Sequence, residues 1–340
     1  MRISRSALIG GGAAFGTLAM ILDSRTALDG AAEGISLCIR SVVPALFPFF
    51  VLSTLLTGSL SGKSSAILRP LGKLCGIPEG GENILITGLL GGYPVGAQCV
   101  GQLFADRKIS KGAARRLLGF CSNAGPAFIF GMSSCILQHK WAPFLLWIIH
   151  ILSALLTGML LPNKSYARIH LAPGKNVNLA QAMQTATRSM TFVCAWVILF
   201  RTFISFAERW FLWLLPREME LAVIGITELT NGYLNLTLLQ NESLRFIFAS
   251  IFLAFGGFCV LLQTASILAQ YGLDMGFYLP GKIMQTIIST VLSYTVSGYL
   301  FHESANLLIP AVLLCCIAGI YIILRKFAQI GSRNPTPSGV

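Results

Sequence analysis

The sequence predicts an all-α, polytopic membrane protein with about eight transmembrane helices and two re-entrant helical hairpins, arranged in two inverted repeats. Hydrophobic residue types make up 54% of the 340 residues and charged types only 11%. A water-soluble domain averages about 45–50% apolar and about 25% charged residues. The mean hydropathy of +0.72 agrees. A soluble enzyme with a single membrane anchor is excluded, because no long polar stretch is left to build the enzyme.

Eight apolar stretches are long enough to cross a bilayer, which takes about 20 helical residues. The first lies in residues 1–28 and is expected to remain uncleaved, because no small-x-small cleavage site follows it. Residues 302–326 hold the C-terminal span, and the tail 327–340 is expected to be disordered in the cytoplasm. The spans after the first are predicted at 42–60, 117–137, 141–161, 189–207, 246–270, 277–301 and 306–324.

Two other apolar stretches have centres rich in glycine and polar residues. They are 84–105, which contains TGLLGGYPVGAQ, and 221–240, which contains GITELTNGY. Paired glycines and Gly-Tyr-Pro would break a straight helix. Broken backbone is tolerated at membrane depth only where protein covers it or where it lines a polar cavity. Both stretches are therefore predicted to enter and leave the membrane on one side.

The distribution of basic residues indicates the orientation of the chain. Lys and Arg number 25 against 13 Asp and Glu, which gives a net charge of +12. In a membrane protein such an excess marks cytoplasmic loops rather than a nucleic-acid surface. With a cytoplasmic N-terminus and two re-entrant hairpins, 18 of the 25 basic residues face the cytoplasm, Arg116 and Lys282 among them. Both termini are thus predicted to be cytoplasmic.

The order of elements repeats in residues 29–161 and 162–301. Each unit has an amphipathic stretch, a span opened by Arg-Ser, a hairpin, an interrupted span and an uninterrupted span. The interruptions read GFCSNAGPAF at 119–128 and LAFGGFC at 253–259. The charge distribution puts the first hairpin inside and the second outside, so the units are inverted. Inverted repeats with broken helices are typical of secondary transporters, whose binding sites lie near the bilayer midplane.

The candidate substrate-binding residues of the first unit lie at the hairpin tip and at the helix break. Glycines at the tip let backbone N–H groups approach a ligand, and the tyrosine can stack on a planar ring or donate its hydroxyl. At the break, a proline removes a helical hydrogen bond beside polar side chains. A turn needed only for packing and a simple kink are the alternatives. The residues are Gly91, Gly92, Tyr93, Pro94, Ser122, Asn123 and Gly125.

Glu228 is the strongest single candidate of the second unit, and Thr230 and Asn231 lie beside it. A carboxylate deep in a bilayer costs at least a few kcal/mol unless it is hydrated, paired or protonated. Glu228 is predicted to bind the substrate or to couple transport to a proton or cation; a solvated loop residue is the alternative. Gly257 and Gln263, at and after the second break, complete the candidate substrate-binding set.

The sequence carries no sign of catalysis. HExxH, GxSxG, P-loop and Rossmann motifs do not occur, so neither an enzyme activity nor a cofactor is expected. The nine cysteines form no CxxC pair and the four histidines share no ligand spacing, so no metal site is expected. Arg201, inside a predicted span, either snorkels to the interface or pairs with an anionic substrate. The expected partners are a small solute, the bilayer, a coupling proton or cation and, by analogy with related transporters, further copies of the chain, without nucleic acid.

Four segments resemble the YlbJ-type sporulation integral membrane proteins. They are SVVPALFPFFVLSTLL (41–56), GLLGGYPVGA (88–97), ISKGAARRLLGFCSNAGPAFIFG (109–131) and TELTNG (227–232). That family belongs to the wider nucleoside-recognition, or Gate, group, which is similar to concentrative nucleoside transporters. The resemblance implies a transporter in the outer forespore membrane of a sporulating cell that moves dipicolinic acid from the mother cell toward the forespore for spore maturation. A non-transporting scaffold or maturation factor in spore envelope assembly and a nucleoside transporter are the alternatives.

Overall fold

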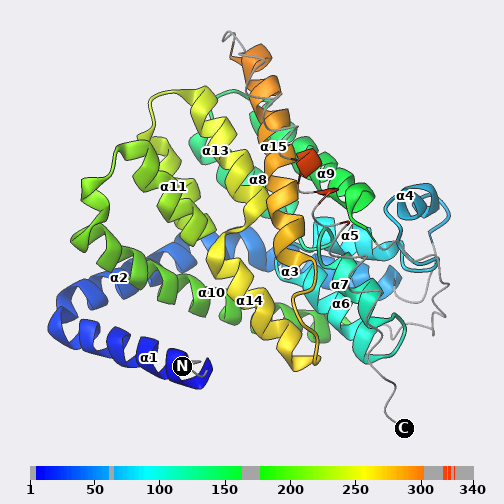
Figure 1. Cartoon of the computed structure of the whole chain (residues 1–340), viewed down its shortest axis with the longest axis horizontal. Coiled ribbons are helices and arrows are strands. Elements are labelled where there is room, and N and C mark those ends of the chain that lie inside the picture. The colour runs from blue at the N-terminus through cyan, green and yellow to red at the C-terminus, as the bar shows by residue number, and fades with distance from the viewer. Residues whose placement is uncertain are drawn as a thin grey trace.

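The computed structural model describes residues 5–60, 65–162 and 177–301, together with 317–319, 321–322 and 325. Every regular element in these residues is a helix, which confirms the all-α prediction (Figure 1). The N-terminal elements are α1 (Arg5–Leu22), α2 (Ser24–Leu37), the π-helical turn η1 (Cys38–Val42) and α3 (Val43–Leu60). They are followed by α4 (Arg69–Leu74), α5 (Asn83–Leu90), α6 (Val95–Ala105), α7 (Lys111–Leu117), α8 (Pro126–Ile136) and α9 (Ala142–Leu160). The C-terminal elements are α10 (Leu179–Trp210), α11 (Arg217–Thr227), α12 (Leu229–Asn235), α13 (Glu242–Phe255), α14 (Gly257–Gln270) and α15 (Tyr278–Leu300), with short 3₁₀ turns at Leu212–Leu214 and Leu236–Leu238.

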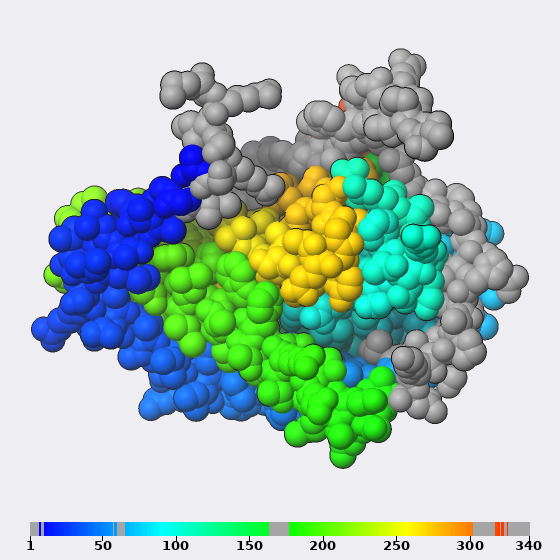
Figure 2. Space-filling model, turned by 90° about the horizontal axis from the view of Figure 1, so that it is seen from below, coloured from blue at the N-terminus to red at the C-terminus, as the bar shows by residue number. Residues whose placement is uncertain are grey.

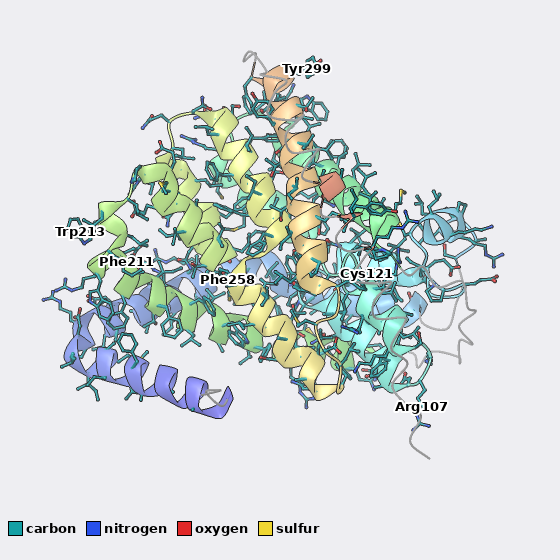
Figure 3. All side chains as sticks on the ribbon, in the orientation of Figure 1. Arg107, Cys121, Phe211, Trp213, Phe258 and Tyr299 are labelled. Atoms are coloured by element: carbon teal, nitrogen blue, oxygen red, sulfur yellow. The ribbon has the colours of Figure 1, made fainter. Side chains whose placement is uncertain are left out.

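Four helical segments among the described residues are long and apolar enough to cross a membrane. They are Ser24–Leu56, Ala142–Leu160, Leu179–Trp210 and Glu242–Gln270. Shorter apolar helices cover Gly10–Leu22, Val95–Ala105 and Pro126–Ile136. Large aromatic side chains are exposed at the edge of the molecule, for example Phe211, Trp213 and Tyr299 (Figure 3), as is typical of a surface that meets lipid. The chain is therefore a multi-pass helical membrane protein; residues 302–316 and 326–340, with most of the predicted last span and the tail, lie outside the described residues.

Each predicted amphipathic stretch and the span that follows it form one continuous helical segment. Helix α2 continues through η1 into α3, and α10 runs unbroken over 32 residues from a capping box at Asn178 and Gln181. The physical reason is that no turn-forming residue separates the polar and apolar parts of either helix. Helix α2 begins at Ser24, where the Asp23 carboxylate accepts a hydrogen bond of 3.3 Å from the Thr26 N–H. The division of the chain at 28/29 stays a prediction.

Helices α2–α3 and α10 pack against each other along their length in an antiparallel arrangement. A Cβ atom at Gly30 would lie 2.6 Å from Ser205 Oγ, and one at Gly34 would lie 2.8 Å from the Ile198 Cα. These glycines therefore permit a close approach of the two backbones. Figure 2 shows α10 as a green band across the face of the molecule beside blue α2 and α3. Helix α1 lies at the periphery and contacts α2.

A second group of helices, formed by α8, α9, α13 and α15, makes up the opposite half of the structure (Figure 1). Helix α15 contacts both α9 and α13, and the Ser250 and Ser289 hydroxyls share a 2.7 Å hydrogen bond between α13 and α15. Fully buried Phe246 and Phe252 belong to the apolar core of this half. This bundle supports the ends of the two hairpins described next.

Both predicted hairpin regions contain two short helices joined by a tight connection, α5–α6 and α11–α12. In the first, a Cβ atom at Gly88 or at Gly96 would collide with the carbonyl oxygen of Cys121. In the second, a Cβ atom at Gly232 would collide with the Gly225 backbone. Glycine is needed at these positions because backbone packs directly on backbone. That the hairpins are re-entrant remains a prediction.

Both predicted helix interruptions are present. Helix α7 ends at Leu117, and an irregular, buried segment leads to α8 at Pro126, so the interruption predicted at 119–128 lies within the span predicted at 117–137. Cys121 in this segment lies inside the fold (Figure 3). Gly256, with φ of +81°, separates α13 from α14. This left-handed conformation favours glycine and interrupts the helical hydrogen bonding.

Arg116 fixes the end of α7 from inside the fold. The residue is 1% exposed, so this basic residue, assigned to the cytoplasmic side, is buried in protein and does not contact solvent. The guanidinium donates hydrogen bonds to backbone carbonyl oxygens of two segments, the α4–α5 connection and the end of α9. These acceptors are Cys75, Gly76, Gly158, Leu161 and Pro162. Five donors in a planar group make arginine suited to joining several chain ends.

Candidate functional site

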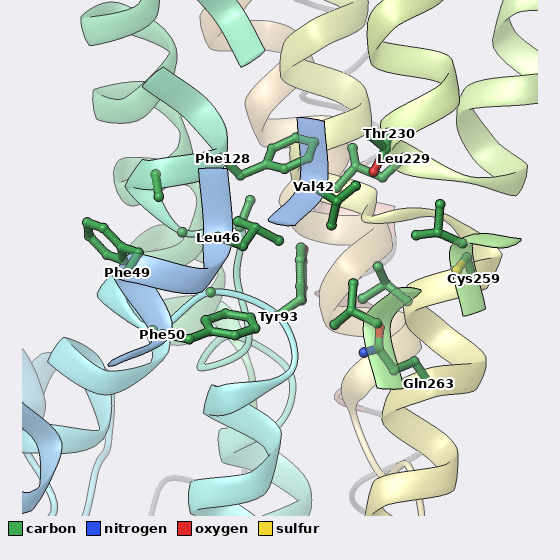
Figure 4. A pocket seen from close by; sticks show the side chains of 18 of the residues that line it. Val42, Leu46, Phe49, Phe50, Tyr93, Phe128, Leu229, Thr230, Cys259 and Gln263 are labelled. Carbon is green, nitrogen blue, oxygen red and sulfur yellow. The ribbon is translucent and has the colours of Figure 1, made fainter. Parts of the chain in front are cut away.

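A cavity of about 50 Å³ lies where the two hairpins meet the two helix breaks (Figure 4). Helices α3 and α10 close it with apolar side chains such as Leu46, Phe50 and Val197. The predicted substrate residues that line it are Gly91, Gly92, Tyr93, Gly125, Glu228, Thr230 and Gln263. Seven of the twelve predicted residues, drawn from four separate segments, therefore surround one space.

The tip of the first hairpin touches both helix breaks. A Cβ atom at Gly125, in the first break, would lie 3.1 Å from the Gly92 Cα. A Cβ atom at Gly256, in the second break, would lie 3.1 Å from the ring of Tyr93. The Tyr93 hydroxyl donates a hydrogen bond of 3.3 Å to the carbonyl oxygen of Leu253 on α13. Tyr93 thus connects the first hairpin to the second broken helix and lines the cavity.

The tip of the second hairpin is organised by Glu228, which caps α12. Its carboxylate accepts hydrogen bonds from the Thr230 N–H at 3.1 Å, the Asn231 N–H at 2.7 Å and the Asn231 side-chain amide at 2.6 Å. The residue is 2% exposed, which excludes the alternative of a solvated loop carboxylate. Unpaired N–H groups at a helix start favour a negative charge. Asn231 therefore holds Glu228, whereas Thr230 also reaches the cavity wall.

Gly257 packs against this tip instead of lining the cavity. Its φ is +83°, and a Cβ atom there would lie 3.3 Å from the Ile226 carbonyl oxygen and from the Leu229 nitrogen. Pro94 and Ser122 also lie outside the cavity wall, although Ser122 is fully buried. Gly257 thus has a backbone packing role in the fold, and a part for Pro94, Ser122 and Gly257 in binding stays a prediction.

Lys282 is the functional candidate that the sequence reasoning missed. The charge distribution assigned it to the cytoplasmic side at the start of the predicted span 277–301. It lies in the second turn of α15 and is 0% exposed. Its ammonium donates to Tyr93 Oη at 3.0 Å, to Asn123 Oδ1 at 3.3 Å and to Gln285 Oε1 at 2.8 Å. The signal that could have identified it is the polar pair Lys282 and Gln285, spaced i,i+3 on one face of a predicted span.

Asn123 does not line the cavity but belongs to the hydrogen-bond network of Lys282 and Gln285. Its Oδ1 also accepts from Gln285 Nε2 at 3.0 Å, and its Nδ2 donates to the Phe120 carbonyl oxygen at 2.8 Å. The neighbouring Ala124 N–H donates to His150 Nε2 on α9 at 3.1 Å. The broken segment therefore satisfies its polar groups through side chains of α9 and α15, as buried backbone requires.

Two further polar side chains complete the electrostatic description. Gln263 is 2% exposed and lines the cavity, and its Nε2 has no hydrogen-bond partner among the described residues. The Gln263 side chain therefore presents an unpaired donor at the cavity wall. Arg201 does not line the cavity; its guanidinium forms ion pairs with Glu33 on α2 and with Glu208 at 3.0 Å. In the described part of the chain, Lys282 is the cation that contacts a cavity-lining side chain.

The comparison with curated proteins finds one similar chain. The sporulation integral membrane protein YlbJ of Bacillus subtilis (strain 168) is 25% identical over an alignment of 331 residues, which covers 82% of this chain and 79% of the relative. No family model matches the chain, and no solved structure matches it. An alignment that covers 82% of the chain must include both hairpins and both helix breaks. The resemblance to the YlbJ-type sporulation integral membrane proteins, drawn from four short segments, is thereby confirmed over most of the chain.

Proposed function

We propose that this chain is a secondary-type transporter of a small anionic aromatic solute and that the cavity between the hairpin tips is its binding site. The single observation that carries the proposal is the convergence of both tips and both helix breaks on one cavity. Gly92 and Glu228 line it together although they are far apart in sequence. Interrupted helices present unpaired backbone groups that a small anion or polar solute can satisfy.

The pattern of helix contacts supports an inverted repeat over 29–161 and 162–301. Helix α6 of the first hairpin contacts α14, the second half of the second broken helix. The equivalent helices of the other unit make the same contact: α12 of the second hairpin contacts α8, the second half of the first broken helix. Helices α9 and α15, which close the two units, contact each other. A two-fold relation between the units exchanges these contacts, and such symmetry underlies alternating access in transporters.

Dipicolinic acid is the substrate that the family resemblance suggests, and the cavity chemistry is compatible with it. Phe50 and Phe128 offer apolar faces to a planar ring, and Tyr93 and Gln263 offer polar groups at its edge. A cavity of about 50 Å³ has room for only a few water molecules. Binding an aromatic dicarboxylate therefore requires part of the wall to move, which is expected of a site that opens alternately to each side.

Glu228 is the proposed coupling residue. An ionised carboxylate in the wall would repel a dicarboxylate, so we expect a proton or a cation to accompany the solute. The distribution of basic residues suggests that both termini are cytoplasmic. Most basic residues are still assigned to the cytoplasmic side when the buried Arg116 and Lys282 are left out of the count. The family resemblance suggests the outer forespore membrane as the location and transport from the mother cell toward the forespore as the direction. The description of the relative as a sporulation integral membrane protein supports a role in sporulation.

Flux of labelled dipicolinate into proteoliposomes tests this function. We expect the parent chain to transport it and Glu228→Gln and Asn123→Ala to lose most of the flux. Glu218→Gln is the matched control, because Glu218 is an exposed carboxylate on α11 of the same hairpin. Unchanged flux in both site variants would remove the proposed site. No flux by the parent, together with stoichiometric capture of an envelope protein, would instead support the scaffold alternative.

A further inference from the structure

A fully buried ammonium lies immediately behind one wall of the cavity. Lys282 is 0% exposed, and each of its three hydrogen-bond acceptors is an uncharged oxygen: a phenol, and the amide oxygens of Asn123 and Gln285. The rings of Tyr93 and Tyr278 lie 5.0 Å and 5.9 Å from the ammonium nitrogen. Among the residues that the structure describes, no carboxylate forms an ion pair with it. A buried ammonium without a countercharge is costly, and an anion in the adjacent cavity would lower that cost.

Tyr93 connects this ammonium to the cavity. Its side chain lines the cavity, and its hydroxyl oxygen accepts the hydrogen bond from Lys282. The hydroxyl proton is directed to the Leu253 carbonyl oxygen over a long 3.3 Å contact. A carboxylate in the cavity can accept that proton's hydrogen bond in place of Leu253. A chain from ammonium to phenol to carboxylate would then form, in which each bond polarises the next.

Gln263 supplies an independent second donor on the opposite helix segment. Its Nε2 is buried without a partner among the described residues, and its side chain lines the same cavity (Figure 4). An unsatisfied buried N–H is unfavourable, and a ligand oxygen would satisfy it. The two donors come from the first hairpin and from α14, so a solute held by both also bridges the two predicted units.

We propose that Lys282, acting through Tyr93, supplies the countercharge for the carboxylate of the solute. This inference rests on the transport function proposed above and names the residue that makes the site prefer a charged solute over a neutral one. Glu228, in the same wall, already has three hydrogen-bond donors of its own from α12. Lys282 is thus the cation left to compensate the solute, and it is a positioning and charge-compensating residue that need not touch the solute directly.

Equilibrium binding to the full-length chain in lipid nanodiscs tests the inference with two probes of equal shape. Pyridine-2,6-dicarboxylate carries the negative charges, and pyridine-2,6-dicarboxamide is neutral. We expect the parent to bind the dicarboxylate about 30-fold or more tightly than the dicarboxamide. In Lys282→Met this preference should disappear through weaker dicarboxylate binding, while dicarboxamide binding is unchanged. Lys282→Arg should retain most of the preference, and Lys140→Met, at an exposed lysine, should behave as the parent.

The outcomes separate this inference from the proposed function. Transport of dicarboxylate by the parent with the same probe preference in Lys282→Met overturns the role of Lys282 and leaves the transporter in place. Equal affinity of the parent chain for the two probes also overturns the role of Lys282, and this result needs no measurement on a variant. Absence of both binding and flux in the parent overturns the proposed function itself. If Lys282→Met does not fold, as judged by thermal unfolding, Lys282→Gln provides the second neutral variant for the same comparison.

Discussion

The hydroxyl oxygen of Tyr93 lies 3.0 Å from the ammonium nitrogen of Lys282, although 189 residues separate them in the chain. Tyr93 belongs to the first hairpin and Lys282 to the last described long helix. Their contact ties the two halves of the structure together at the cavity wall. A change at either residue is therefore expected to affect solute recognition more than local stability.

Removing only the hydroxyl of Tyr93 tests its role as the connecting group. In Tyr93→Phe the ring remains to line the cavity, but the link to Lys282 is lost. We expect dicarboxylate affinity to fall by about tenfold, the effect of one hydrogen bond to a charged group. Tyr299→Phe, at a tyrosine that is 82% exposed, should leave the affinity unchanged. Equal affinities of Tyr93→Phe and the parent would show that the hydroxyl plays no part in binding.

Gly256 has a left-handed backbone and also a close contact with Tyr93, whereas Gly272 has a left-handed backbone without such a contact. Gly256→Ala puts a Cβ atom on a residue at φ of +81° and brings it to 3.1 Å from the Tyr93 ring. Gly272→Ala imposes a similar left-handed conformation, φ of +65°, with nothing within 4 Å. Both should lose about 1–2 kcal/mol of unfolding free energy. Only Gly256→Ala should also lower flux and solute affinity; a matching loss in Gly272→Ala would contradict the contact argument.

The first hairpin should tolerate no side chain at its contact with the broken segment. Gly96→Ala would drive a Cβ atom into the Cys121 carbonyl oxygen. Overpacking of this kind costs about 1–3 kcal/mol, measurable as a lower unfolding temperature in detergent. Gly112→Ala is the control, because its Cβ atom would meet only Ser110 Oγ at 3.9 Å in an exposed part of α7. A Gly96→Ala chain as stable as Gly112→Ala would show that the hairpin and the break are not in contact.

The inverted arrangement makes a prediction about the two sides of the membrane. In a background that lacks the exposed Cys135, we expect a cysteine at Arg107, after α6, to react with a membrane-impermeant thiol reagent from the cytoplasmic side. A cysteine at Leu238, after α12, should react only from the other side. Leu238 is 46% exposed, so a lack of reaction would not come from burial in the fold. Labelling of both from one side would contradict opposite insertion of the hairpins.

Composition and local pattern were sufficient for the helical membrane class, for both helix breaks and for the two hairpin regions. The glycines of 84–105 and 221–240 and Pro126 act within a few residues of themselves, because they change the local backbone preference or remove a backbone donor. Seven of the twelve candidate residues line the cavity. Six of them lie at or next to helix ends, which are visible in a sequence, and Gln263 lies inside α14 as a polar residue of a predicted span. Their role in binding stays a prediction.

Only the tertiary structure decided which groups compensate one another. From the sequence, Lys282 is a cytoplasmic-side cation at the start of the predicted span 277–301, and Arg201 is a span residue that either snorkels or pairs with an anionic substrate. Packing reverses these assignments, because α2 brings Glu33 to Arg201 while the first hairpin and the broken segment bring Tyr93 and Asn123 to Lys282. The free energy of a buried charge depends on neighbours distant in the chain. The sequence alone therefore determined where the backbone breaks, and the fold determined where the charge sits.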